Sequence, residues 1–284
     1  MSEFVEIFEM GPRDGLQNER NNIPTADKIS LVNCLSKAGF KRIEVGSFVS
    51  PRWVPQMADS AQVLTNIQRQ PGVSYTALTP NMQGFNRAVM AQADEIAIFG
   101  SASEGFSKAN INATIAESLE RFGPVIDAAR SVNLPVRGYI SCVTDCPFDG
   151  PTSPKKVAQV AAYMKKAGCY EISLGDTIGQ GTPESILAML TAVLNEVPAD
   201  ELAGHYHDTA GRALINIEAS LQVGLRVFDA AVGGLGGCPY APGAAGNVAT
   251  EAVNDWLVQR GYLTGLKPTI LETAAGMARD MRSK

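Results

Sequence analysis

The sequence predicts an α/β protein that folds as one (β/α)8 barrel. Short β-branched or alternating runs recur along the 284 residues, and apolar residues at helical spacing follow each run. Eight such units over about 260 residues agree with a barrel of this kind in number and length. A doubly wound open sheet would have five or six strands and a Gly-x-Gly-x-x-Gly loop after the first, where this chain has Gly11-Pro12-Arg13-Asp14-Gly15.

The predicted strands are short runs bounded by turn-forming residues. In chain order they are Val5–Phe8, Arg42–Val45, Val73–Leu78, Glu95–Phe99, Val136–Cys142, Glu171–Leu174, Ala203–His207 and Arg226–Val232. In a barrel, reactive side chains lie on one face, where the strands end and the loops begin. We therefore expect the active site at the C-terminal ends of these strands.

Capping residues mark several of the helices that connect the strands. The start and stop signals are Thr25, Ser153-Pro154, Thr182-Pro183-Glu184, Gly39 and Gly168. Since no low-complexity linker divides the chain, we expect a single catalytic domain over residues 1–284. Residues from about 262 onward are predicted to form a final helix that packs against the outside of the barrel or folds over its mouth.

Composition excludes several classes of protein. With 45% hydrophobic and 19% charged residues, the chain is not intrinsically disordered. The net charge is -5 and no Lys/Arg block exceeds the pairs at 155–156 and 165–166, which argues against a nucleic-acid partner. Without an apolar run of about 18 residues or a basic-then-apolar leader, we expect no membrane span and a cytoplasmic location.

The five cysteines are odd in number and scattered, which indicates reduced thiols. Cys142 and Cys146 are four residues apart, wider than the C-x-x-C spacing of zinc sites, and no second pair completes such a site. Cys238 differs because it lies in the glycine-rich stretch Gly233–Asn247, which holds six glycines in fifteen residues. A thiol in a mobile loop could exchange protons with a substrate, and a purely structural thiol is the alternative.

The chain has only two histidines, His205 and His207, and they stand two apart in one predicted strand. Because side chains alternate along a strand, both imidazoles point to the same face and could converge on one metal ion. Two independently hydrogen-bonded histidines are the alternative. Asp14 is the leading candidate for an oxygen ligand, although it could instead cap a turn. Such a donor set suits Mg²⁺ or Mn²⁺ better than structural zinc.

Several stretches together resemble the 3-hydroxy-3-methylglutaryl-CoA lyase family, and the likeness runs from about residue 4 to 280. The wider group of metal-dependent aldol and Claisen barrels shares the Arg-Asp-Gly-x-Gln element. The stretches Ser47–Asp59 and Gly234–Ala241 are specific to the lyases. Gly46 and Pro242 depart from the residues that many members have, and neither touches a proposed ligand. The stretches are Gly11–Glu19, Ser47–Asp59, Gly175–Gly179, His205–Thr209 and Gly234–Ala241.

The resemblance implies an enzyme that cleaves (S)-3-hydroxy-3-methylglutaryl-CoA to acetyl-CoA and acetoacetate, as in leucine degradation and ketone-body formation. It implies a divalent metal cation bound by residues matching Asp14, His205, His207 and Asn247, which chelates the substrate's carboxylate and hydroxyl oxygens. Binding to the cation lowers the pKa of the hydroxyl.

The resemblance also implies roles for further residues. Arg13 would stabilise the enolate oxygen and Cys238 would protonate the enolate carbon. Glu44, at the end of the second strand, would orient Arg13, or serve only as an interior ion-pair partner. Asp14, a metal-bound water and Asp176 compete as the base, and Arg13 and Thr177 are expected to contact the substrate.

Three alternatives stay open at this point. One is a Claisen synthase such as isopropylmalate or homocitrate synthase, although the chain ends too soon after the eighth strand to hold their regulatory domain. Another is a lyase for a longer, branched 3-hydroxyglutaryl-CoA, which only the volume of the pocket would distinguish. The third is a metal-binding barrel that serves as a partner-recognition scaffold rather than an enzyme, which leaves Arg13, Glu44 and Cys238 unexplained. Barrels of this type are often dimers, so a homodimer is expected.

Overall fold

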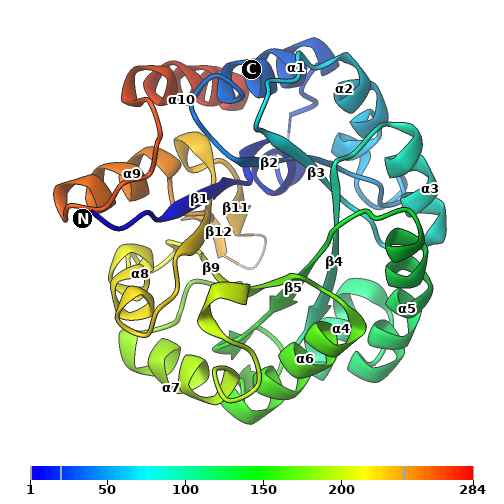
Figure 1. Ribbon diagram of the computed structural model, residues 1–284, viewed down its shortest axis with the longest axis vertical. Coiled ribbons are helices and arrows are strands. Elements are labelled where there is room, and N and C mark those ends of the chain that lie inside the picture. The colour runs from blue at the N-terminus through cyan, green and yellow to red at the C-terminus, as the bar shows by residue number, and fades with distance from the viewer. Residues whose placement is uncertain (1, 20, 239–240, 284) are drawn as a thin grey trace.

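A computed structural model describes residues 2–19, 21–238 and 241–283. Within these ranges eight parallel strands close into a barrel and helices surround it (Figure 1). The order around the barrel is β1-β10-β9-β8-β5-β4-β3-β2, so the (β/α)8 prediction is confirmed. The barrel strands are β1 (Glu6–Glu9), β2 (Arg42–Ser47), β3 (Ser74–Leu78), β4 (Glu95–Ser101), β5 (Val136–Ser141), β8 (Glu171–Asp176), β9 (Leu202–Tyr206) and β10 (Val227–Ala230).

The helices form the outer ring because parallel neighbours in a sheet need a crossover connection that covers the sheet. Their apolar faces pack on the outer face of the barrel, where the buried residues are mainly leucine, isoleucine, valine and alanine. The helices are α1 (Thr25–Leu35), α2 (Ser60–Asn66), α3 (Met82–Met90), α4 (Glu104–Ile111), α5 (Ile115–Ser131), α6 (Pro154–Ala167), α7 (Pro183–Val193), α8 (Ala213–Gln222), α9 (Thr250–Gln259) and α10 (Pro268–Ser283).

Several predicted boundaries shift by one or two residues. The fifth strand ends at Ser141 because Cys142 has a left-handed φ of 59°. Helix α1 begins at Thr25 as predicted, but the Thr25 hydroxyl donates to Asp59 rather than capping the helix. Thr182 does cap α7, since its side chain accepts from the Ser185 backbone N–H.

Two small hairpins were not predicted from the sequence. One follows β5 and pairs β6 (Asp145–Cys146) with β7 (Gly150–Pro151). The other follows β10 and pairs β11 (Gly237–Cys238) with β12 (Ala241–Ala245). Their strands are too short to show a hydrophobic period, and both hairpins lie in loops at the C-terminal ends of the barrel strands.

The final helix, α10, packs against the outside of the barrel beside α1 and α9 (Figure 1). Its buried face includes Leu271, Ala275 and Met281. Near its end, the Arg282 guanidinium donates to the carbonyl oxygens of Gly233 and Gly234, in the loop after β10. Of the two predicted positions for this helix, the structure therefore has the outer one.

The barrel interior contains charged as well as apolar side chains. Alternate residues of each strand point inward, so Phe8 and Met10 on one side of the interior meet Tyr139 on the other. Arg137 and Glu44 are fully buried in the same space. Among the described helices, none combines the length and the apolar character that a bilayer crossing requires.

Candidate active site

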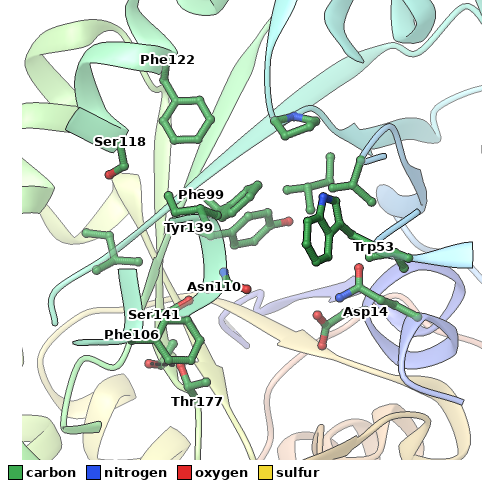
Figure 2. A pocket seen from close by; sticks show the side chains of 18 of the residues that line it. Asp14, Trp53, Phe99, Phe106, Asn110, Ser118, Phe122, Tyr139, Ser141 and Thr177 are labelled. Atoms are coloured by element: carbon green, nitrogen blue, oxygen red, sulfur yellow. Dashed lines mark hydrogen bonds between the residues drawn. The ribbon is translucent and has the colours of Figure 1, made fainter. Parts of the chain in front are cut away.

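A cavity of about 1030 Å³ opens at the C-terminal ends of the barrel strands. Figure 2 shows Asp14 and Thr177 among its side chains, together with the neighbouring aromatic rings of Phe99 and Tyr139. A cavity of this size is typical of small-molecule sites. The predicted site residues that line it are Arg13, Asp14, Thr177, His205 and His207.

His205, His207 and Asp14 converge in this cavity. His205 lies in β9 and His207 directly follows that strand, and their ring centroids are 5.3 Å apart. Asp14 lies in a single π-helical turn, η1 (Gly11–Gly15), just after β1. One ligand atom from each of the three side chains lies within 4.8 Å of the others. The predicted meeting of both imidazoles with Asp14 is thus present in the structure.

Asn247, the fourth predicted ligand, adjoins the same cluster. Its backbone forms an isolated antiparallel bridge with His207. Its side-chain nitrogen donates to Asp14 Oδ2 at 2.7 Å and to the carbonyl oxygen of Leu235 at 3.3 Å. Because the amide nitrogen is engaged in these bonds, the carbonyl oxygen is the atom of Asn247 suited to a cation.

The donor atoms of the cluster fit a divalent metal ion. Nδ1 of His207 is buried and has no hydrogen-bond partner among the described residues, which is uncommon for a buried polar atom. Burial, reinforced by the neighbouring His205, lowers the pKa of His207 to about 4, so this ring is neutral. Burial opposes ionisation of Asp14, but Arg13 and the two histidines outweigh it and lower its pKa to about 2. A neutral imidazole and a carboxylate are the forms that bind a metal.

Arg13 is held in a fixed orientation beside the cluster. Its Nε donates to Glu44 Oε2 at 2.5 Å and its Nη1 donates to Asp14 Oδ1 at 2.6 Å. The guanidinium carbon also lies 5.5 Å from the centroid of the Tyr139 ring, and the Tyr139 hydroxyl donates to Glu44 Oε1. Glu44 therefore contacts Arg13 as expected, although it lies in the middle of β2 rather than at its end.

The side chain of Asp176 lies outside the cavity. Its side chain accepts from the Gly181 backbone N–H at 2.9 Å and from the Thr144 hydroxyl at 3.0 Å. Gly175 and Thr177, its neighbours on either side, line the cavity, whereas Asp176 points away from it. Asp176 therefore fixes the loop after β8 and lies outside the cavity, so the structure does not place it where a base would act.

Thr177 faces the cavity with a hydroxyl that accepts from the Cys142 backbone N–H at 2.8 Å. Cys238 stands in β11, and the backbone of that strand pairs with β12 at the register Cys238 to Ala241. Its side chain lies outside the part of the chain whose side chains are described. The predicted role of its thiol is therefore a proposal.

Asp229 was not predicted as a site residue. It lies in β10, and its Oδ2 is 3.1 Å from Nδ1 of His205. The only signal in the sequence is an acidic residue within an otherwise apolar run, Val227–Ala230. Asp229 and His205 are 24 residues apart in the chain and come into contact because β10 and β9 are neighbours in the closed barrel.

The HMGL-like family matches residues 4–277. The chain belongs to the hydroxymethylglutaryl-CoA lyase family. It is 58% identical over 262 residues to "Hydroxymethylglutaryl-CoA lyase, mitochondrial" of Gallus gallus, covering 92% of this chain and 88% of the relative. A Pseudomonas aeruginosa lyase named for 3-hydroxy-3-isohexenylglutaryl-CoA and hydroxymethylglutaryl-CoA is 58% identical over 249 residues, covering 88% of this chain and 83% of the relative.

A solved lyase of the same family has nearly the same fold. The crystal structure of the HMG-CoA lyase from Brucella melitensis superposes with a TM-score of 0.99 at 59% identity, and the match covers 100% of both chains. The lyase family that the motifs indicated is therefore confirmed along the whole barrel.

Proposed function

We propose that this chain is a lyase that cleaves (S)-3-hydroxy-3-methylglutaryl-CoA to acetyl-CoA and acetoacetate. The observation that carries the proposal is the convergence of Asp14, His205 and His207 beside Arg13 in one cavity. Membership of the lyase family supports the same reaction, and the high identity to named lyases favours it over a Claisen synthase.

A divalent cation, Mg²⁺ or Mn²⁺, would be held by Asp14, His205, His207 and the side-chain oxygen of Asn247. When bound, it makes the substrate's tertiary hydroxyl more acidic and orients it with the terminal carboxylate. Arg13 and the two histidines lower the pKa of Asp14 to about 2, which keeps its side chain in the carboxylate form that binds a cation.

The remaining steps fall to side chains. Asp14 or a water molecule in the cavity takes the proton of the hydroxyl, and the electron pair left on the oxygen forms the ketone of acetoacetate. The C2–C3 bond breaks, and its electrons pass to the thioester as an enolate. Arg13 donates to the enolate oxygen, and Glu44 and Asp14 keep its guanidinium aimed at the cavity. Cys238 returns one proton to the enolate carbon, which completes acetyl-CoA, and Thr177 contributes a hydroxyl to the substrate-facing wall.

The test measures acetyl-CoA release from purified protein before and after treatment with a chelator. We expect the chelated enzyme to be inactive with 3-hydroxy-3-methylglutaryl-CoA and to regain activity when Mn²⁺ or Mg²⁺ is added. A parallel assay with a longer, branched 3-hydroxyglutaryl-CoA examines the substrate alternative. Absence of acetyl-CoA release, or full activity without metal, would reject the proposal.

A second test concerns the thiol of Cys238. The variant Cys238→Ser should bind Mn²⁺ as the wild type does but lose nearly all turnover, because a serine hydroxyl is a far weaker acid than a thiol. Calorimetry with Mn²⁺ and the acetyl-CoA assay measure the two properties. Unchanged turnover would return this thiol to a structural role.

Three further features belong to the proposal: one catalytic domain over residues 1–284, a homodimer and a cytoplasmic location. The apolar residues of α10 packed against the rest of the barrel support the first of these. Light scattering of the purified protein measures the second, with twice the mass of the 30.1 kDa chain as the expected result.

A further inference from the structure

Arg137 occupies a fully enclosed position inside the barrel, in β5. Its Nε donates to Glu171 at 2.6 Å, and its two terminal nitrogens donate to the two oxygens of Asp229 at 3.1 and 2.8 Å. The rings of Phe8 and Tyr139 lie 4.5 and 5.0 Å from the guanidinium carbon. A bidentate contact of this kind fixes the plane of the carboxylate as well as its position.

Asp229 in turn orients His205, one of the proposed metal ligands. Its Oδ2 accepts from the Ser173 hydroxyl at 2.7 Å and lies 3.1 Å from Nδ1 of His205. A carboxylate beside Nδ1 requires the proton on that nitrogen, which leaves the lone pair on Nε2. Nε2 is the atom that points to the cluster, 4.0 Å from Asp14 Oδ2. The bond to Asp229 therefore sets both the rotation and the tautomer of the His205 ring.

The far side of Arg137 is equally constrained. Glu171 is held by Arg42, whose two terminal nitrogens donate hydrogen bonds to the two Glu171 oxygens at 2.8 and 3.1 Å. Arg42 Nε donates in turn to Glu6, the first residue of β1, at 2.6 Å. A chain of ion pairs thus runs from the N-terminal end of the barrel to His205, and Arg137 is its central link.

We propose that Arg137 is a positioning residue for the metal site: acting through Asp229, with the help of Ser173, it fixes the orientation and tautomer of His205. The inference rests on the proposed metal site of Asp14, His205 and His207. Arg137 is not among the residues that line the cavity, so it acts without touching the substrate. Partners of metal-bound histidines commonly change metal affinity by about 10- to 100-fold when they are substituted.

The test measures Mn²⁺ affinity from the electron paramagnetic resonance signal of the free ion, without substrate. Arg137→Lys keeps the charge but loses the fork that holds both oxygens of Asp229. We expect Mn²⁺ to bind this variant at least about 10-fold more weakly than the wild type. Glu6→Gln is the matched control, because it breaks the chain of ion pairs beyond Arg42 and should leave Mn²⁺ affinity unchanged.

A double-mutant cycle separates positioning from a general effect on the barrel. If Arg137 acts through Asp229, then Arg137→Lys should weaken Mn²⁺ binding little further once Asp229→Asn is present. Wild-type Mn²⁺ affinity in a folded Arg137→Lys protein would overturn the inference. So would a double variant whose loss of Mn²⁺ affinity equals the product of the two single fold-losses.

Ser173→Ala decides the question if Arg137→Lys does not fold, since it removes only one hydroxyl donor to Asp229. We expect it to bind Mn²⁺ about threefold more weakly, and unchanged affinity in this variant would overturn the inference. Failure of the wild type to bind Mn²⁺ would instead reject the proposed metal site itself, so the two failures are distinguishable.

Discussion

Both ends of the barrel interior contain buried charged side chains, but these pair with one another at one end and face the cavity at the other. Toward the N-terminal end, Arg42, Arg137 and Glu171 bind one another and bring no donor to the cavity. Toward the C-terminal end, Asp14 and His207 face the cavity, and Nδ1 of His207 has no partner among the described residues. Buried charge alone therefore does not mark the active site. A cluster of polar side chains that lines a cavity and includes a buried atom without a protein partner does.

This difference predicts different consequences of substitution at the two ends. Breaking a buried ion pair by removing one partner costs roughly 3–5 kcal/mol of stability. Substitutions at the closed N-terminal end should therefore lower stability, and at Arg137, which contacts Asp229, they should also weaken metal binding. Substitutions at the open C-terminal end should appear mainly as lost turnover.

The largest effect on stability is expected for Glu171→Gln. Glu171 accepts from both Arg42 and Arg137, so its loss takes one charge partner from each of two buried guanidinium groups. We expect the free energy of unfolding to fall by about 3–5 kcal/mol in urea titrations of the metal-free protein. A loss below about 1 kcal/mol would show that the ion pairs at this end do not hold the barrel together.

The next effect is expected at Arg13, where turnover and stability can be separated. Arg13→Gln should lower kcat by about 10²- to 10³-fold, because a donor to the developing oxyanion is lost. The same change also leaves the buried Glu44 without its cation and so lowers stability. Adding Glu44→Gln should restore much of the stability without restoring kcat. Recovery of kcat in the double variant would remove Arg13 from the chemistry.

The smallest effect is a dependence of stability on pH at Glu95. Burial, opposed by Arg42 and Arg137, raises the pKa of Glu95 from 4.5 to about 7. Between these values the folded chain holds a proton that the unfolded chain releases, so this group makes stability fall as pH rises through that window. Glu95→Gln needs no proton. We expect it to match the wild type near pH 5 and to exceed it at pH 8 by about 1–3 kcal/mol.

Thermal or urea unfolding of both proteins at the two pH values measures this difference. Glu9, whose pKa burial also raises to about 7, is unchanged in both proteins and so cancels in the comparison. An equal stability difference at pH 5 and pH 8 would contradict the expected titration of Glu95.

The sequence was sufficient to predict the barrel strands and most of the residues that meet at the site. The strands show a period of two, and the rule that barrel loops at one end carry the chemistry brought Arg13, Asp14 and the histidines together. The same alternation explains why Asp176 lies outside the cavity, since Gly175 and Thr177 occupy the inward positions of that strand end.

Other features depend on contacts that no local pattern encodes. Arg137 and Asp229 are 92 residues apart in the chain and meet only across the closed barrel. The π-helical turn that presents Asp14 spans only five residues, too few to leave a periodic signal. Local periodicity therefore predicted which residues enter the barrel, and the pairing of distant side chains required the structure.

The most direct test of the metal site is an anomalous difference map from crystals grown with Mn²⁺. We expect one strong peak within bonding distance of a carboxylate oxygen of Asp14 and of a ring nitrogen of each histidine, His205 and His207. A peak elsewhere in the molecule, or an empty cluster in crystals of protein that is active with Mn²⁺, would contradict it.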